Sequence, residues 1–320
     1  MKLLSGLGVA FVSVVGLFGY LTVVDLATRR IRARRRNAIV AVAWSVPALL
    51  LMGSMLLYPL VATVWWSFKD ADSAAYVGLA NYRYIFTNPD VRTAFRNSMF
   101  WLVGFTTLVV TIGLVVATLT DRVRYERIAK AVIVMPMAIS FVGAGVIWGF
   151  MYDFRPPGTT QTGTLNGALG ALGRDPVPWL AQRNTVNPAL IAIGVWMFVG
   201  FAAVLLSAAI KGVPTEIIEA ARVDGATEIQ TFVRIILPTI LPNIAVVGTL
   251  MAITALKAFD IVYVLTNGNF GSEVIATAMY KQLFSARNLG RASALAVALL
   301  GATLPIILVN TRIFKRQAAA

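Results

Sequence analysis

The chain has 320 residues, of which 58% are hydrophobic and only 13% are charged, and its formal net charge is +14. This apolar fraction exceeds what the core of a soluble protein can bury, so we expect a polytopic membrane protein. The chain has neither cysteine nor histidine, which excludes thiol nucleophiles, disulfides, Cys/His metal sites and imidazole acid–base chemistry.

A Gly-rich loop that ends in Gly-Lys-Ser/Thr is also absent from the sequence, so no phosphate-binding loop for ATP is expected. We therefore expect a non-enzymatic subunit without catalytic residues, metal ligands or a cofactor of its own. The basic charge falls at the ends of apolar stretches, where anionic membrane lipid attracts it. This pattern favours lipid over nucleic acid as the partner of the positive charges.

Seven stretches with few or no charges are long enough to cross a bilayer, which takes about 20 residues. They cover residues 3–24, 37–68, 97–120, 131–152, 184–210, 235–256 and 292–311. A backbone in lipid must satisfy its own hydrogen bonds, and these stretches lack the alternating pattern of barrel strands. The sequence therefore predicts an all-α protein with about seven transmembrane helices.

The first stretch, residues 3–24, has an alternative interpretation as a signal peptide with Lys2 as its only basic residue. Its apolar run is long, no clear small-residue cleavage site follows, and the arginines come after it, as in a stop-transfer anchor. We expect it to be retained as an extra helix. The predicted division is thus residues 1–37 for this helix and a basic link, 38–316 for a six-helix core, and 317–320 for the tail.

Arginine and lysine gather in alternate links between the stretches, which sets the orientation of the protein. The first link holds six arginines and the third holds four basic residues, namely Arg29, Arg30, Arg32, Arg34, Arg35, Arg36, Arg122, Arg124, Arg127 and Lys130. Both links are expected in the cytoplasm. Seven crossings then place the N-terminus outside, and the loop at residues 211–238 and the C-terminus inside.

The 211–238 loop, called the Glu-Ala-Ala loop below, carries the most specific motif in the chain. Glu219-Ala220-Ala221 is followed after three residues by Gly225, and after nine more by Ile235-Ile236-Leu237-Pro238. We expect one short helix with Pro214 in its first turn and Gly225 at its end. Thr227 and Gln230 predict a capping box for a second short helix, which Pro238 ends or kinks.

This motif resembles, at every fixed position, the loop through which bacterial ABC-importer permeases dock on their ATPase subunits. The alternative is an ordinary amphipathic loop, but the full spacing is far more specific than Glu-Ala-Ala alone. The resemblance assigns ATPase coupling to Glu219, Ala220, Ala221, Arg222, Asp224, Gly225, Leu237 and Pro238.

Other segments resemble the maltose-type sugar permeases of this class, from about residue 38 to residue 316. They are Val77-Gly78-Leu79-Ala80-Asn81-Tyr82 with Phe86, and Asp260 with Thr266-Asn267-Gly268. Residues 128–148 and Gln161-Thr162-Gly163 are most similar to the alpha-glucoside branch. The chain departs from the family pattern at Gly268-Asn269-Phe270, where the family has Gly-Gly-Pro.

The resemblance implies a maltose-type importer permease in the bacterial inner membrane that works by alternating access. Its implied partners are a second permease subunit in a heterodimer, an ATPase dimer that binds ATP and Mg²⁺, and an extracytoplasmic sugar-binding protein. The cargo would be an alpha-glucoside or a related di- or oligosaccharide.

Ionisable residues within a span are candidates for function because hydrocarbon disfavours them. Lys257 and Asp260 are three residues apart, so on one helix face they could neutralise each other and bind sugar hydroxyls, or form a structural ion pair. Thr254, Thr266 and Asn267 are further candidates on the same segment. Aromatic faces suit sugar rings, which adds Trp196, Phe198 and Phe201, although such residues more often pack against helices or lipid.

Two other classes of function are weighed against this one. An ion-coupled secondary sugar transporter would normally show inverted repeats or midplane carboxylates, for which only Asp260 qualifies. A membrane enzyme would need clustered carboxylates, whereas Asp25, Asp121 and Asp153 are scattered. An ABC permease for another solute, such as glycerol phosphate, remains an alternative within the class.

Overall fold

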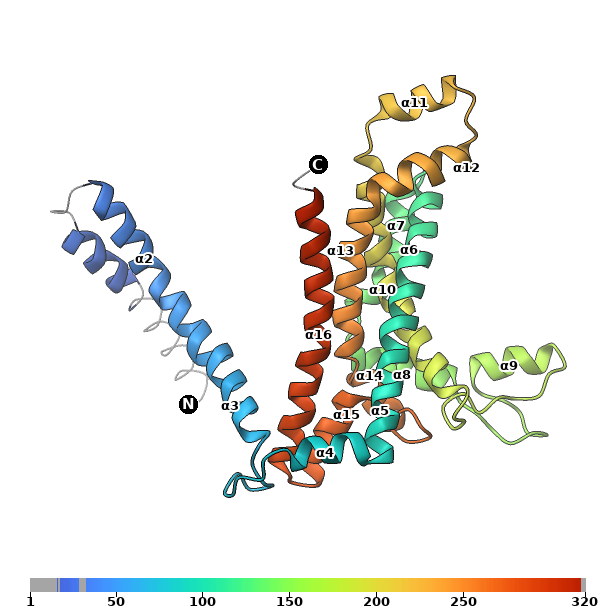
Figure 1. The fold of residues 1–320 in the computed structure, drawn as a ribbon. Coiled ribbons are helices and arrows are strands. Elements are labelled where there is room, and N and C mark those ends of the chain that lie inside the picture. Colours follow the sequence, from blue (N-terminus) through green and yellow to red (C-terminus); the bar gives the residue numbers. More distant parts are fainter. Residues whose placement is uncertain (1–15, 17, 29–32, 318–320) are drawn as a thin grey trace. The chain divides into compact units, whose positions relative to one another are not determined.

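The computed structural model describes residue 16 and residues 18–28 and 33–317, which are helical with connecting turns (Figure 1). In this described part of the chain, extended pairing is limited to one isolated bridge between Lys69 and Tyr76. The predicted all-α fold is confirmed. Its physical reason is that helices satisfy their backbone hydrogen bonds within the segment.

The chain divides into two compact units, one up to Trp65 and the other from Trp66 onward. The first unit contains a helix over Phe18–Thr28, α2 (Ala33–Met52), the π-helical turn η1 (Gly53–Leu57) and α3 (Tyr58–Trp66), whose last residue is the first of the second unit. The Tyr20 hydroxyl donates a hydrogen bond of 2.9 Å to the Ala43 carbonyl, which ties the first helix to α2. The expected span at residues 3–24 lies largely outside the described residues, so its retention and the predicted 1–37, 38–316 and 317–320 division stay predictions.

The second unit begins with two helices and continues through a long helical rod. Its first elements are α4 (Ala80–Thr87), α5 (Pro89–Phe100), η2 (Trp101–Phe105), α6 (Thr106–Thr120), α7 (Glu126–Val134), the 3₁₀ turn η3 (Met135–Ala138), α8 (Phe141–Met151) and α9 (Thr164–Ala171). They are followed by α10 (Val186–Lys211), α11 (Thr215–Val223), α12 (Glu228–Thr231), η4 (Phe232–Ile236), α13 (Leu237–Leu256), α14 (Asp260–Thr266), α15 (Ile275–Tyr280), η5 (Lys281–Ser285) and α16 (Leu289–Gln317).

Within the described residues, five helices are long and apolar enough to cross a membrane. They are Ile39–Trp66, Pro89–Thr120, Val186–Lys211, Glu228–Thr266 and Leu289–Leu308. A sixth candidate is a pair, Glu126–Ala138 with Phe141–Met151, which bends by 98° at a short break. These six correspond to the last six predicted stretches, and the total of seven stays a prediction.

Helix α10 is the centre of the second unit. Of the apolar window of α10, 61% is buried inside the protein, against 22% for the Pro89–Thr120 rod. It packs against α6, α7 and α13, and Leu190, Ile193 and Leu206 on it are fully buried. Contacts with α10 therefore hold these helices together, and α6 also contacts α7 and α13 directly.

Two glycines allow α10 and its neighbours to approach at backbone distance. A Cβ added at Gly200 of α10 would lie 2.1 Å from the carbonyl oxygen of Ile133 on α7. A Cβ at Gly113 of α6 would lie 2.7 Å from the Cβ of Ala202 on α10. Small residues at such crossings are typical of membrane helices, because close packing rather than the hydrophobic effect holds them together.

Opposite ends of the second unit carry different elements (Figure 1). The Glu-Ala-Ala loop with α11 and α12 projects at one end, and α4, α9 and α15 lie at the other. At the latter end, the Asn97 amide donates to the carbonyls of Gly271 and Glu273, at 2.7 and 2.8 Å, which ties α5 to the turn before α15. The two ends are thus built from separate segments connected by the long helices.

The contact at Gly200 gives the first prediction. In Gly200→Ala the new methyl group cannot fit against the Ile133 carbonyl, so α7 and α10 must separate at an overpacking cost of about 1–3 kcal/mol. We expect a lower midpoint of thermal unfolding for the protein purified in mild detergent. The matched control is Gly248→Ala on α13, where no atom lies within 4 Å of the added Cβ. Equal midpoints for both variants and the parent protein would contradict the close-packing interpretation.

Candidate functional site

The Glu-Ala-Ala loop has the two-helix shape that its sequence predicts. Helix α11 follows Pro214 and ends before Gly225, which has a positive φ of 81°. Thr227 Oγ1 accepts a hydrogen bond from the backbone N–H of Gln230, and the Gln230 side chain accepts one from the backbone N–H of Thr227. The left-handed turn at Gly225 and the capping box are both confirmed, and only Pro214 is displaced, by one residue, to the position before the helix.

The second helix of the loop was predicted to be short and to end or kink at Pro238. In the structure it does not end there. Helix α12 continues through η4 into α13, so the helical path runs on past Pro238. The proline ring crowds the carbonyl of the residue four positions earlier, Arg234, and lacks an N–H. The π-helical turn η4 (Phe232–Ile236) widens the helix directly before the proline and lets it continue.

Most of the predicted coupling residues lie on the surface of this loop. Glu219, Ala220, Arg222, Asp224, Gly225 and Pro238 are exposed, Leu237 is half-buried, and Ala221 is buried. Beside them the loop exposes large aliphatic side chains, with Val223 87% and Ile229 76% exposed. Such apolar side chains at the tip of a projecting loop are typical of a surface that contacts another protein.

Ion pairs connect the two helices of the loop with the end of α6. Glu228, the first residue of α12, is 2.9 Å from Arg222 of α11 and 3.5 Å from Arg122 after α6. All three side chains are more than half exposed, so each pair adds little stability. Their geometric consequence is that the loop is in contact with the turn between α6 and α7.

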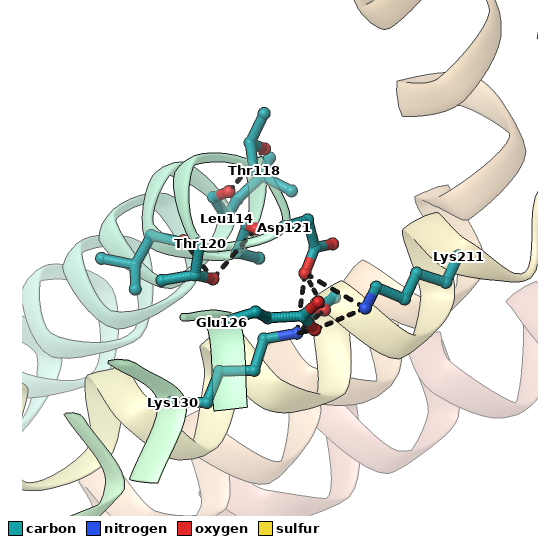
Figure 2. A network of polar contacts seen from close by, with 10 residues as sticks. Leu114, Thr118, Thr120, Asp121, Glu126, Lys130 and Lys211 are labelled. Carbon is teal, nitrogen blue, oxygen red and sulfur yellow. Dashed lines mark hydrogen bonds and ion pairs between the residues drawn. The ribbon is translucent and has the colours of Figure 1, made fainter. Parts of the chain in front are cut away.

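A second polar cluster lies next to this contact and is called the Lys130 network (Figure 2). It consists of Asp121 at the end of α6, Glu126 and Lys130 on α7, and Ser207 and Lys211 on α10. The Lys130 ammonium donates to Asp121 Oδ1 at 2.7 Å, to Glu126 Oε1 at 2.5 Å and to Ser207 Oγ. Ser207 donates to Asp121 Oδ1 at 2.6 Å, and Lys211 pairs with Glu126.

A cavity of about 290 Å³ lies between the long helices. Its walls come from η2, α8, α10 and the segment between α13 and α14. The lining residues are Trp101, Phe105, Phe141, Gly194, Phe198, Thr254, Ala255, Lys257, Ala258, Phe259, Asp260 and Ile261. Four of them, Phe198, Thr254, Lys257 and Asp260, are candidates that the sequence predicted.

Lys257 and Asp260 line this cavity, but not on one helix face as predicted. Helix α13 ends at Leu256, and α14 begins at Asp260, so the two residues flank a break in the helix. None of the ion pairs found among the described residues joins their side chains. The predicted i, i+3 neutralising pair is therefore wrong in its geometry, because the break removes the helical spacing on which it depended.

The other four predicted candidates lie outside the cavity lining. Thr266 is buried and hydrogen-bonds to Ser272, and Asn267 caps α14 in the left-handed conformation. Trp196 contacts Trp148 edge-on at 5.7 Å between ring centroids, and Phe201 packs against the core. In the structure Thr266, Trp196 and Phe201 pack or hydrogen-bond within the fold, whereas the side chain of Asn267 is exposed.

Sequence reasoning missed four aromatic side chains of the cavity, namely Trp101, Phe105, Phe141 and Phe259. Three of them, Trp101, Phe105 and Phe141, form a connected set with Phe198, whose ring centroid is 5.9 Å from those of Phe105 and Phe141. The ring of Phe259 instead contacts Tyr263 and Tyr280. Trp101 and Phe105 are four residues apart, a spacing that places both on one helix face. That spacing is a local signal, but the convergence of η2 and α8 on Phe198 is visible only in the fold.

Trp101 also brings a hydrogen-bond donor that has no acceptor within the described residues. The side chain is 2% exposed, and its Nε1 is buried without a partner. An unpaired buried donor costs about 1–3 kcal/mol. Trp101 is one of the residues that line the cavity, but its Nε1 has almost no accessible surface, so a ligand oxygen in the cavity would reach this donor only if the indole ring shifts. Within the described residues, no group of three acidic side chains could hold a metal ion.

Comparison with known proteins places these features in a family. The chain is 51% identical over 271 residues to the osmoprotective compounds uptake permease protein GgtC of Synechocystis, covering 85% of this chain and 97% of that protein. It is 41% identical over 293 residues to the alpha-glucoside transport system permease protein AglF of Rhizobium meliloti, covering 91% and 87%.

The fold is similar to that of a chain in a bacterial ABC transporter for the import of alginate, with a TM-score of 0.76 at 23% identity, covering 87% of this chain and 95% of that one. A second structure of a bacterial alginate ABC transporter, in complex with an alginate pentasaccharide-bound periplasmic protein, gives a TM-score of 0.74 at 25% identity, covering 90% and 98%. The family model that matches residues 109–318 includes α10, the Glu-Ala-Ala loop and most of the cavity lining. The chain belongs to the family of inner membrane components of binding-protein-dependent transport systems.

Proposed function

We propose that this chain is the permease subunit of an ATP-driven importer for alpha-glucosides or related di- and oligosaccharides. The observation that carries the proposal is the continuous helical path from the exposed Glu-Ala-Ala loop, through α12 and α13, to the cavity at Lys257. A displacement applied to the loop therefore reaches the cavity wall through a helix. The family to which the chain belongs and the ABC transporters with a similar fold support this function.

The proposed role of the Glu-Ala-Ala loop is to dock on an ATPase subunit, which binds ATP and Mg²⁺. Val223 and Ile229 offer apolar contacts, and Glu219, Arg222 and Asp224 surround them with charge. The buried Ala221 lets α11 lie close against its own loop, and the exposed Ala220 adds no bulk on the outer side.

Other partners in the proposal are an extracytoplasmic sugar-binding protein and a second permease subunit. The N-terminus of this chain would lie outside the cell and its C-terminus inside.

The proposed site for the sugar is the 290 Å³ cavity. Aromatic rings suit the C–H face of a pyranose, and Trp101 Nε1, Lys257, Thr254 and Asp260 offer hydrogen bonds to its hydroxyl groups. The mixture of apolar walls and a few polar groups is typical of small-molecule sites. The relative AglF, whose name specifies alpha-glucoside transport, supports this substrate class.

A second candidate cargo is an osmoprotective compound with a quaternary ammonium group, because the relative GgtC is named for osmoprotective compounds. Aromatic side chains can surround such a cation, and five line this cavity. The sugar is favoured because Lys257 and Asp260 both line this cavity, where their opposite charges offer donors and acceptors to hydroxyl groups and no net negative charge for a cation. In competition assays on the reconstituted importer, we expect excess trehalose, maltose or sucrose to reduce labelled alpha-glucoside uptake and glycine betaine to leave it unchanged. The reverse result would favour the second candidate.

The docking role predicts the effect of a change at Gly225. In Gly225→Val a β-branched residue must adopt a positive φ, which strains the turn between α11 and α12 and adds bulk to the docking surface. We expect the ATPase subunit to be lost on co-purification, or sugar uptake per ATP hydrolysed to fall by about tenfold or more. Both quantities are measured on the complex reconstituted in proteoliposomes.

The matched control for this variant is Gly158→Val. Gly158 has a φ of 84°, against 81° for Gly225, and no atom lies within 4 Å of a Cβ added at either position. The control therefore introduces the same backbone strain in the loop between α8 and α9, far along the chain from the Glu-Ala-Ala loop. Normal ATPase retention and normal uptake in Gly225→Val would contradict docking through this loop.

The unpaired indole N–H of Trp101 leads to a prediction about transport when this group is removed. Trp101→Phe removes a buried N–H that has no partner in the described protein, so no hydrogen bond within the protein is lost, and the cost to stability is that of the smaller ring in the core. If a sugar oxygen accepts that N–H, uptake at saturating sugar-loaded binding protein should fall by about 5- to 20-fold. Trp148→Phe is the control, because Trp148 Nε1 is also unpartnered but lies outside the cavity lining. Equal uptake by both variants would argue against a sugar in this cavity.

A further inference from the structure

The Lys130 network joins α6, α7 and α10, which belong to segments that carry cavity aromatics or lead to them. Asp121 follows the Pro89–Thr120 rod, which contains Trp101 and Phe105 in η2 and continues as α6. Lys130 is on α7, which leads through η3 to Phe141 at the start of α8. Ser207 is on α10, nine residues after Phe198. The network and the cavity aromatics are thus connected directly along the Pro89–Thr120 rod and along α10, where Phe198 lies near the middle of the helix, and through the 98° bend before α8 for Phe141.

Every N–H donor of the Lys130 ammonium group has an acceptor, so the Lys130 network is a specific junction between the three helices. An ammonium group has three N–H donors, and those of Lys130 have three acceptors, one from each of α6, α7 and α10. The Lys130 and Asp121 side chains are 17% and 13% exposed. Burial weakens the screening of their charges by water and salt, so this junction resists displacement more than the exposed pairs around it.

A second feature connects the junction to the Glu-Ala-Ala loop. Arg122, the neighbour of Asp121, pairs with Glu228, and Glu228 also pairs with Arg222 of α11. Lys211, which is the last residue of α10 and the first of the loop, pairs with Glu126. The loop thus contacts the junction from both sides, through the α6 end and through the α10 end.

We propose that the Lys130 network makes α6, α7 and α10 move as one body when the Glu-Ala-Ala loop is displaced, so that Asp121, Lys130 and Ser207 are positioning residues that keep the cavity aromatics together during transport. Helix α13 receives the same displacement directly, because it continues from the loop. The cavity then changes shape because α13, with the break after it, moves relative to the body formed by α6, α7 and α10. This inference rests on the proposed function of the loop.

The test is Lys130→Met in the complete reconstituted importer, which keeps an unbranched side chain, one atom shorter, and removes the charge and the donors. We expect the complex to assemble and to hydrolyse ATP, while sugar uptake per ATP falls by about tenfold, the size of a typical coupling free energy between sites. The control is Arg127→Met on the same helix, whose side chain is exposed and whose ratio should be unchanged. Ser207→Ala, which removes one acceptor of Lys130, should lower the ratio less than Lys130→Met.

The double variant Lys130→Met/Ser207→Ala should be no worse than Lys130→Met alone, because both changes break one junction. An unchanged uptake-to-ATP ratio in Lys130→Met would overturn the inference. If the complex with Lys130→Met does not assemble, the Ser207→Ala variant is the test by itself. An unchanged uptake-to-ATP ratio in Ser207→Ala would then overturn the inference. The Gly225→Val experiment separates the two proposals. If Gly225→Val uncouples uptake from ATP hydrolysis but Lys130→Met and Ser207→Ala do not, docking through the loop still holds. Only the proposed role of the Lys130 network is then removed.

Discussion

The hydrogen bonds of the backbone are the constraint on which the rest of this structure depends. In hydrocarbon every N–H and C=O needs a partner, so non-helical backbone at membrane depth is stable only where it is covered by protein or lines a cavity. The second unit interrupts its long helices at two such places, before Phe141 and between Leu256 and Asp260. Both interruptions supply residues to the same cavity. The two irregular segments therefore meet at this cavity, which no motif had indicated.

The cavity and the Glu-Ala-Ala loop are connected by two different kinds of structure. Helix α13 makes a covalent connection, whereas the other cavity walls are connected by side-chain contacts at the Lys130 network. Backbone packing adds to these contacts, since Gly200 lets α7 lie directly on α10. The central helix α10 takes part in the cavity, the network and the loop, through Phe198, Ser207 and Lys211.

Local signals predicted much of this arrangement, and contacts between distant residues account for what they missed. The capping box at Thr227 and the left-handed turn at Gly225 depend on neighbours in sequence, and both were predicted correctly. No proline or glycine lies at the helix break after Leu256, so no local signal predicts this break. The predicted Lys257–Asp260 geometry was wrong for that reason. Lys130 was recognised only as a basic residue, because its partner Ser207 is 77 residues away in sequence.

The helical run from Glu228 to Leu256 connects the Glu-Ala-Ala loop to the cavity in one piece. Its 29 residues measure about 43 Å at 1.5 Å per residue, whereas the hydrocarbon core of a bilayer is about 30 Å thick. The run is therefore longer than such an apolar layer. With the docking role proposed for the loop, a tilt forced on the Glu228 end would be carried along the whole run to Thr254, so that an event outside the apolar layer would change the cavity inside it.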